Sequence, residues 1–126
     1  MSTTAEDALA QGGVIDITTV GARSGANRRI EIFFHQFDGS YYITGRPGHK
    51  RDWLANLIAN PRFTVHLRDN ARTDVTAEAR LIKDTKERER VLHRILTESW
   101  DNEPAKADNI LPRWVDDAPL IEFTLA

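Results

Sequence analysis

The chain has 126 residues, of which 40% are hydrophobic and 29% charged, and its net charge at neutral pH is −2. This length predicts one domain, residues 1–126, with a single core. The absence of cysteine excludes disulfides and thiolate chemistry and is typical of the cytoplasm. Residues 1–12 do not resemble a secretory signal, and no apolar run reaches the ~20 residues that span a bilayer. We expect a cytoplasmic protein without a transmembrane segment, whose residues 1–12 are flexible or form a short helix.

The charge is unevenly distributed along the chain. Residues 1–20 carry three acidic groups and sum to −3, whereas residues 21–51 carry six basic and two acidic groups and sum to +4. The remainder holds eleven basic and fourteen acidic groups, for −3. A local basic excess in an acidic chain favours a focused anion site over a nucleic-acid surface, which usually makes a whole domain basic. We therefore expect no nucleic acid among the partners.

The first half of the chain predicts three strands and a helix. Residues 14–20 are rich in β-branched residues and predict a strand, followed by a glycine turn over 21–27. Residues 28–37 alternate between apolar and polar, the dipeptide Asp38-Gly39 indicates a hairpin, and residues 40–44 return as a third strand. A glycine-rich loop then leads to a helix over 52–60, which Asn60-Pro61 ends.

The second half predicts two strands, a helix and a last strand. Residues 62–69 and 73–82 alternate, with Phe63, Val65 and Leu67 expected on the inner side of the first. Asp84 and Glu87 form a capping box before a helix. We expect this helix to bury Val91, Leu92, Ile95 and Leu96 and to expose Lys86, Arg88, Glu89 and Arg90. Residues 101–113 hold two prolines and predict a connector or short helix, and residues 119–125 predict a sixth strand.

The order of these elements predicts the architecture. Strands joined by hairpins, without strand–helix–strand crossovers, indicate an antiparallel sheet that closes as a small barrel. The fold class is therefore α+β, mainly β, with six strands and two to three flanking helices. Side chains fill a barrel of this size, so we expect any ligand in an outer groove formed by loops.

Few side chains suggest chemistry of their own. The four histidines, at positions 35, 49, 66 and 93, lack metal-ligand spacing, so we expect no metal and place them on the surface or in a groove. Ser24 has no evident base nearby, and "GARSG" lacks the spacing of a phosphate-binding Walker loop. An enzyme of this composition would depend on a cofactor for its chemistry.

Two basic loops, over residues 21–28 and 45–51, are predicted to face each other. They follow the first and third strands, whose carboxyl ends lie at the same end of an antiparallel meander. Glycines, guanidinium groups and the start of a helix would then converge into a site for phosphate or carboxylates, with Trp53 as an aromatic wall. The alternative is that the arginines are solvated turn residues and that Trp53 belongs to the core.

Two stretches, "ITTVGARSGANRR" and "FDGSYYITGRPGHKRDWLANLIANPRFTVHL", resemble the deazaflavin-dependent nitroreductase family, also described as coenzyme F-420-dependent quinone reductases. The similarity covers roughly residues 14–82. It implies a split β-barrel of the flavin-reductase type with a reduced deazaflavin (coenzyme F-420) in its groove. It also implies hydride transfer to a small electrophilic acceptor: a quinone, an enone or a nitro compound.

The resemblance also implies roles for individual residues. Those at the positions that hold the phosphate-bearing tail are Arg23, Ser24 and Arg28. Those in the loop that lines the deazaflavin ring are Thr44, Gly45 and Arg46. Further cofactor-binding candidates are Lys50 and Arg51 in the same loop, and Trp53, which matches the helix motif together with Asn56.

Catalytic residues stay undefined by this resemblance, with Thr44 and Tyr42 as hydroxyl candidates for proton transfer. The C-terminal tyrosines that some family members place around a nitro substrate have no counterpart here. The resemblance therefore supports cofactor binding more strongly than it supports any particular electron acceptor. Three alternatives remain: an FMN-binding reductase of the same barrel, a non-catalytic carrier of a flavin, haem or lipid, and, ranked last, a nucleic-acid module. The chain could be a monomer or a homodimer.

Overall fold

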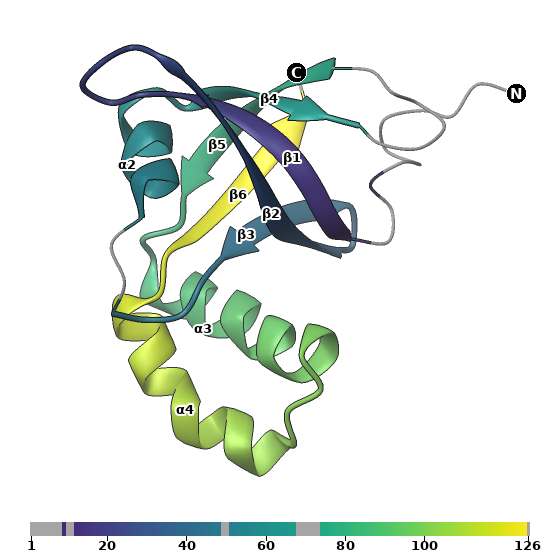
Figure 1. Ribbon diagram of the computed structural model, residues 1–126. Helices are drawn as coiled ribbons and strands as arrows, with labels where there is room; N and C mark the ends of the chain where they lie inside the picture. Colours follow the sequence, from purple (N-terminus) through teal and green to yellow (C-terminus); the bar gives the residue numbers. More distant parts are fainter. Residues whose placement is uncertain (1–8, 10–11, 49–50, 68–73, 126) are drawn as a thin grey trace, which may run out of the picture.

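Six antiparallel strands close into a barrel in the computed structural model, which describes residues 9, 12–48, 51–67 and 74–125 (Figure 1). The strands are β1 (Gly13–Val20), β2 (Asn27–Phe37), β3 (Ser40–Thr44), β4 (Arg62–His66), β5 (Asp74–Leu81) and β6 (Leu120–Leu125). Their order around the barrel is β1-β2-β3-β6-β5-β4, with every neighbouring pair antiparallel. The fold class predicted from the sequence is confirmed.

Every second side chain of the strands points into the barrel, and these side chains fill its interior. Ile17, Ile43, Val65, Ala77 and Phe123 are fully buried in one cluster, which also takes in Leu9. The Phe123 ring stacks on Tyr41 at 5.2 Å between centroids and meets the Phe63 ring edge-on at 5.6 Å. Because the interior is packed with side chains, a ligand has to bind outside it. Of residues 1–12, predicted to be flexible or helical, only Leu9 and Gly12 lie within the described residues.

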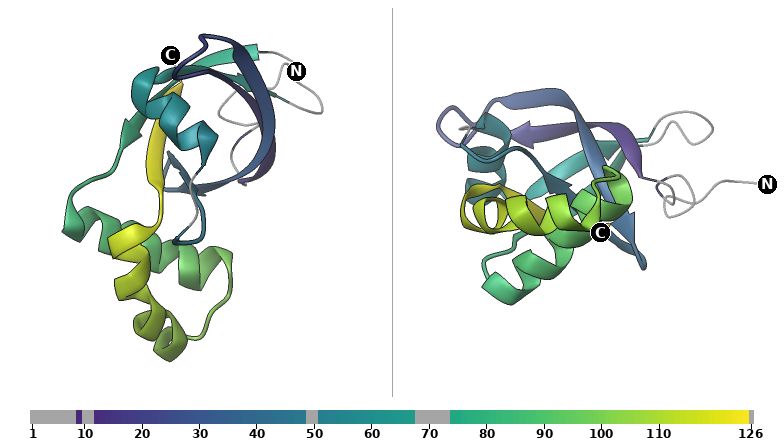
Figure 2. Two further views of the ribbon diagram at one scale, coloured as in Figure 1. Left: turned by 60° about the vertical axis from the view of Figure 1, so that its left-hand side comes forward. Right: turned by 90° about the horizontal axis from the view of Figure 1, so that it is seen from below.

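Three helices flank the barrel. Helix α2 (Asp52–Ala59) lies beside β1 and β5, and helices α3 (Thr85–Arg94) and α4 (Pro104–Asp117) form a separate layer (Figure 1). Both views of Figure 2 show α3 and α4 side by side on one side of the barrel. One π-helical segment, η1 (Ile95–Ser99), continues α3. A second apolar cluster, which includes Tyr42, Ile82, Leu92, Ile95 and Leu120, joins this layer to the barrel.

Helix α4 corrects the connector or short helix predicted for residues 101–113. It has 14 residues and ends at Asp117. Pro104 stands in its first turn, where proline's missing N–H has no intrahelical partner to lose. Pro112 does remove one helix hydrogen bond, but it is exposed and the helix continues past it. The prolines therefore mark one helix start and one internal position.

Arg88 corrects a second expectation, because its guanidinium is not turned to water. It donates hydrogen bonds of 2.5–3.3 Å to four backbone carbonyls, those of Ile82, Trp114, Val115 and Ala118. The last carbonyls of a helix have few partners within that helix, and here the Trp114 carbonyl also accepts the Ala118 N–H at 2.9 Å. A cation among these carbonyls satisfies both their hydrogen bonds and their negative potential. Arg88 thereby ties α3 to the end of α4.

His35 was expected at the surface or in a groove; it is buried, and it lines a hollow of about 730 Å³. Only 5% of the residue is exposed, and its Nε2 has no hydrogen-bond partner among the described residues. Its ring meets the ring of Trp100 edge-on at 5.3 Å. Burial lowers the pKa of His35 from 6.5 to about 4, so the imidazole is neutral at neutral pH.

This burial predicts a pH-dependent loss of stability. The unfolded chain takes up a proton at His35 below pH 6.5, and the folded chain only below about 4. The free energy of unfolding therefore keeps its full value, as far as His35 is concerned, above pH 6.5. It decreases as the pH falls towards 4, by up to about 3 kcal/mol. Chemical unfolding of the wild type and of His35→Phe across this range measures it. The variant should lack this part of the decline, whereas the control His93→Gln, at a half-exposed histidine, should retain it.

Candidate functional site

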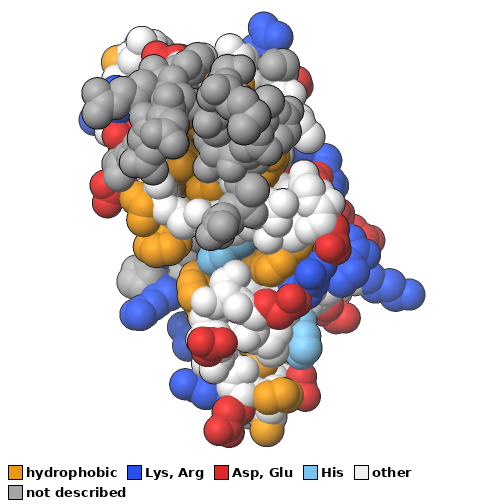
Figure 3. Space-filling model, turned by 90° about the vertical axis from the view of Figure 1, so that its right-hand side faces the viewer, with side chains coloured by type: hydrophobic (Ala, Val, Ile, Leu, Met, Phe, Trp, Pro, Cys, Tyr) orange, Lys and Arg blue, Asp and Glu red, His pale blue; other side chains and the backbone are white. Residues whose placement is uncertain are grey.

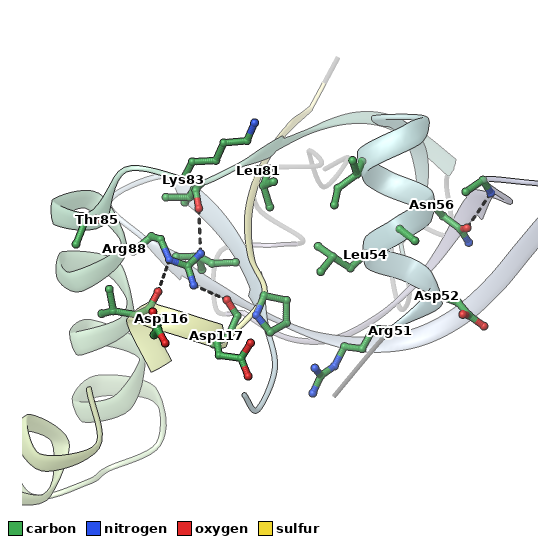
Figure 4. A pocket seen from close by; sticks show the side chains of 18 of the residues that line it. Arg51, Asp52, Leu54, Asn56, Leu81, Lys83, Thr85, Arg88, Asp116 and Asp117 are labelled. Carbon is green, nitrogen blue, oxygen red and sulfur yellow. Dashed lines mark hydrogen bonds between the residues drawn. The ribbon is translucent and has the colours of Figure 1, made fainter. Parts of the chain in front are cut away.

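A groove of about 1440 Å³ opens between the β1–β2 loop, α2 and the ends of α3 and α4 (Figure 4). Its lining comes from four stretches of the chain, within residues 21–28, 51–58, 81–89 and 111–120. None of the fully buried barrel residues Ile17, Ile43, Val65 or Phe123 contributes to it. The groove therefore lies on the outside of the barrel.

The β1–β2 loop forms one end of this groove as a tight glycine turn. The Gly21 N–H donates to the Ala26 carbonyl at 2.8 Å, and the Gly25 N–H donates to the Gly21 carbonyl at 3.0 Å. Gly25 has a φ of 70°, a conformation that favours glycine. The Ser24 hydroxyl accepts a hydrogen bond from the Ala26 N–H at 3.1 Å and remains free to donate. The turn thus presents residues 22–24 to the groove.

Asn56 anchors this loop to α2. Its Oδ1 accepts a hydrogen bond from the Ala22 N–H at 2.9 Å, and its Nδ2 donates to the Thr19 hydroxyl at 3.1 Å. The side chain is buried, with 7% of the residue exposed, and it lines the groove (Figure 4). One amide therefore fixes both the end of β1 and the start of the loop relative to α2.

The arginines of the loop have different environments. Arg29 forms an ion pair with Asp16 across β1 and β2, at 3.0 Å. Arg23 and Arg28 both line the groove and are exposed, and neither has a hydrogen bond or ion pair within the described part of the chain. Two guanidinium groups therefore stand free at one end of the groove, where an anionic ligand can reach them.

The second basic loop contributes Arg51 to the same groove. The Arg51 guanidinium turns back over its own loop and donates to the Arg46 carbonyl at 3.0 Å. A Cβ on Gly45 would lie 2.6 Å from the guanidinium carbon, so the glycine makes room for this side chain. The structure thus brings the loops at 21–28 and 45–51 together, with Arg51 as the described lining residue of the second.

The other residues that the sequence suggested for cofactor binding or catalysis are not among the described residues that line the groove. Thr44 is buried and its hydroxyl donates to the Pro119 carbonyl. Tyr42 is buried in the cluster beneath α3 and α4, and Trp53 is partly buried against the barrel core. Gly45 and Arg46 belong to the loop without lining the groove. Lys50 lies outside the described residues.

Sequence reasoning missed the side of the groove that faces away from the β1–β2 loop. Leu54 and Ile58 come from α2, and Leu111 and Val115 come from α4. Leu111 went unnoticed because residues 101–113 were predicted as a connector or short helix, and Val115 lies just beyond that range. Helical spacing of Leu111 and Val115, four residues apart, was the available signal.

A polar chain of Thr18, His66 and Asp74 lies elsewhere, on three neighbouring strands. Thr18 Oγ1 lies 2.6 Å from His66 Nε2, and His66 Nδ1 lies 2.7 Å from Asp74 Oδ1. The order hydroxyl, imidazole, carboxylate resembles a nucleophile with its base. None of the three lines the groove, so we interpret them as cross-strand contacts that stabilise the barrel.

A second, smaller hollow lies beside His35 and Trp100 and shares no lining residue with the groove. On the face seen in Figure 3, basic and acidic side chains intermix, and hydrophobic ones gather beside the residues drawn in grey. Among the described residues, no group of three or more histidine and acidic side chains could hold a metal ion. Within that same part of the chain, no helix is both long and apolar enough to cross a membrane.

The anchoring role of Asn56 leads to a prediction. Asn56→Leu should expose the Ala22 N–H to solvent and cost about 1–3 kcal/mol of stability, because two buried hydrogen bonds are lost. Hydrogen exchange at the Ala22 amide should accelerate more than exchange at the Gly21 amide, which bonds within the loop. The control Asn60→Ala removes one longer bond, to the Val20 carbonyl at 3.3 Å, and should leave exchange at Ala22 unchanged. Unaltered Ala22 exchange in Asn56→Leu would contradict the anchor.

Comparison with solved structures shows a shared fold. A conserved hypothetical protein from Mycobacterium tuberculosis has a TM-score of 0.71 at 13% identity, over 95% of this chain and 77% of that chain. The F420-H2 dependent reductase FDR-A has a TM-score of 0.60 at 22% identity, over 88% and 93%. The haem storage protein HutZ from Vibrio cholerae has a TM-score of 0.64 at 18% identity, over 99% and 89%.

The sequence comparison goes further than the fold. No curated protein matches this sequence significantly. The family profile described as F420H(2)-dependent quinone reductase matches residues 3–117, which is nearly the whole chain. This range includes every residue that lines the groove except residues 118–120. The chain therefore belongs to the F420H2-dependent quinone reductase family, a family of oxidoreductases.

Proposed function

We propose that this chain uses reduced coenzyme F420 to reduce a small quinone bound beside the cofactor in the groove. Membership of the family establishes an F420-dependent oxidoreductase; the acceptor and the residue roles are our proposal. The observation that carries it is the pair Arg23 and Arg28, exposed at one end of the groove without a partner among the described residues.

The groove fits the cofactor in charge and in size. The tail of F420 carries a phosphate and carboxylates, and guanidinium groups bind both by charge-assisted hydrogen bonds. Pockets for a single small ligand measure roughly 300–1000 Å³. A groove of about 1440 Å³ exceeds that range and has room for a cofactor and an acceptor together.

We assign the tail to the β1–β2 loop and the ring to the loop after β3. Arg23, Ser24 and Arg28 would hold the phosphate, with the Ser24 hydroxyl as an additional donor. Arg51 would bind from the second loop. Thr44, Gly45 and Arg46 would then position the ring through the loop backbone. Trp53 would act indirectly, by packing α2 against the barrel.

The reaction needs alignment more than acid–base groups. Reduced F420 supplies a hydride and a proton, so that the quinone becomes a hydroquinone and the deazaflavin is left oxidised. The chain's residues would hold donor and acceptor in contact and exclude water between them. The Thr44 hydroxyl already donates its hydrogen to the Pro119 carbonyl, so we assign any further proton exchange to solvent.

Anaerobic mixing of the purified chain with F420H2 and menadione tests this function. The visible absorbance of oxidised F420 should return at a rate proportional to enzyme concentration, with one menadiol formed per F420. Turnover with reduced FMN and none with F420H2 would establish the FMN reductase instead. Binding of F420 without turnover of any quinone would establish a carrier.

Arg23→Ala and Arg28→Ala should each weaken F420 binding about 10- to 150-fold, equivalent to ~1.5–3 kcal/mol for a charge-assisted hydrogen bond. Tryptophan fluorescence titration measures the affinity, and thermal melting should show almost unchanged stability because both side chains are exposed. The matched control is Arg62→Ala, at an exposed residue that begins β4 and lies outside the groove lining. Lower stability with unchanged affinity would give these arginines a structural role.

A further inference from the structure

The half of the groove away from the β1–β2 loop is an apolar slot between α2 and α4. Leu54 and Ile58 line it from α2, and Leu111 and Val115 line it from α4. Ile58 is 57% exposed, an unusual position for a large aliphatic side chain on a short helix. Figure 4 shows Leu54 and Leu81 turned towards the space between the helices. Aliphatic walls of this kind suit a flat, uncharged ring.

Carboxylates stand at the rim of this slot. Asp116 and Asp117 end α4, Glu89 lies on α3, and all three are exposed and line the groove. None of them has a hydrogen bond or ion pair within the described residues. The rim therefore carries carboxylates that no hydrogen bond or ion pair holds among the described residues, although Asp116 interacts with Arg88 through its charge.

No basic group nearby forms an ion pair with these carboxylates among the described residues, although Arg113 and Asp117 both approach Gly48. The Arg88 guanidinium is occupied by its four carbonyls, beneath the end of α4. Lys83 also lines the groove, and Figure 4 shows its side chain extending away from Asp116 and Asp117. The two ends of the groove consequently differ, with free arginines at the β1–β2 loop and free carboxylates at the end of α4.

We propose that the end of α4 selects the charge of the electron acceptor: the slot takes uncharged or cationic quinones and rejects anionic ones. This rests on the proposed function, since it concerns the second ligand of the same groove. The aliphatic walls bind the ring, and Asp116 and Asp117 repel a sulfonate or carboxylate on it. Repulsion between charges at a protein surface changes affinity by about tenfold per close pair.

Three naphthoquinones that share one ring and one point of attachment test this selection. One carries a hydroxyethyl chain, one a sulfonatoethyl chain and one a trimethylammonioethyl chain. With saturating F420H2, the wild type should show a kcat/KM for the anion at least about tenfold below that for the neutral compound. The cation should equal or exceed the neutral compound. Raising the ionic strength should narrow these ratios, because salt screens exposed charges.

The double variant Asp116→Asn/Asp117→Asn should raise the anion-to-neutral ratio about three- to tenfold, and Asp117→Asn alone should raise it less. The ratio within each variant cancels any effect on F420 itself. The control Glu78→Gln/Glu103→Gln makes the same change in net charge outside the groove lining and should keep the wild-type ratio. Thermal melting confirms that each variant is folded.

The outcomes separate the two proposals. If the wild type reduces none of the three compounds, the quinone reductase function fails and the selection fails with it. If the neutral compound is reduced but the anion is reduced equally well, only the selection is wrong. A preference that Asp116→Asn/Asp117→Asn leaves unchanged also overturns it, because the discrimination then arises from the cofactor's own charge.

Discussion

The contact of Arg88 with four carbonyls is the interaction on which the arrangement of the helices depends. These carbonyls belong to the link after β5, the last turn of α4 and the link into β6. A single guanidinium therefore ties together three segments, which also meet through apolar packing and through the hydrogen bond from the Ile82 N–H to the Leu120 carbonyl. Burial lowers the pKa of Arg88, with Asp116 opposing the shift, yet a guanidinium stays charged in proteins. Removing it would take a hydrogen-bond donor from all four carbonyls, of which Trp114 keeps the Ala118 N–H as a partner.

On the opposite wall of the groove, Asn56 likewise fixes neighbouring segments to one another through hydrogen bonds. Where Arg88 uses charge, Asn56 uses a neutral amide that donates and accepts at once. The groove is thus bounded by two side chains whose polar atoms are directed at backbone or neighbouring polar groups, leaving Arg23, Arg28 and Asp117 free at its ends. Figure 4 shows Asn56 and Arg88 with their hydrogen bonds, on two different sides of the groove.

The barrel could be predicted from the sequence because its determinants are local. Alternation places Val65 and Ala77 inside, and a turn at Asp38-Gly39 sets one hairpin. The roles of Arg88 and His35 could not be predicted in this way. The carbonyls that Arg88 binds lie up to 30 residues away, and His35 is covered by Trp100 from a distant segment. The hydrophobic periodicity of a sequence gives no information about contacts between residues so far apart in the chain.

Of the candidate site, too, only the part that depends on a local sequence pattern could be predicted. A glycine turn with arginines is a short-range pattern, and the structure places Arg23, Ser24, Arg28 and Arg51 along one groove. The opposite wall depends on α4, whose prolines concealed the helix. Trp53 shows the limit of a motif: its spacing matched both a groove and a core position, and only the packing of α2 distinguishes them.

The separation of the groove from the barrel interior has an evolutionary consequence. Ile58, Asp116 and Asp117 line the groove and are exposed, and none of them belongs to either apolar cluster. Surface substitutions of this kind usually change stability by less than about 0.5 kcal/mol. Such a wall can be rewritten one residue at a time while the barrel and the arginine turn persist. Descendants of one ancestral chain could thus exchange electron acceptors rapidly and still keep the same cofactor.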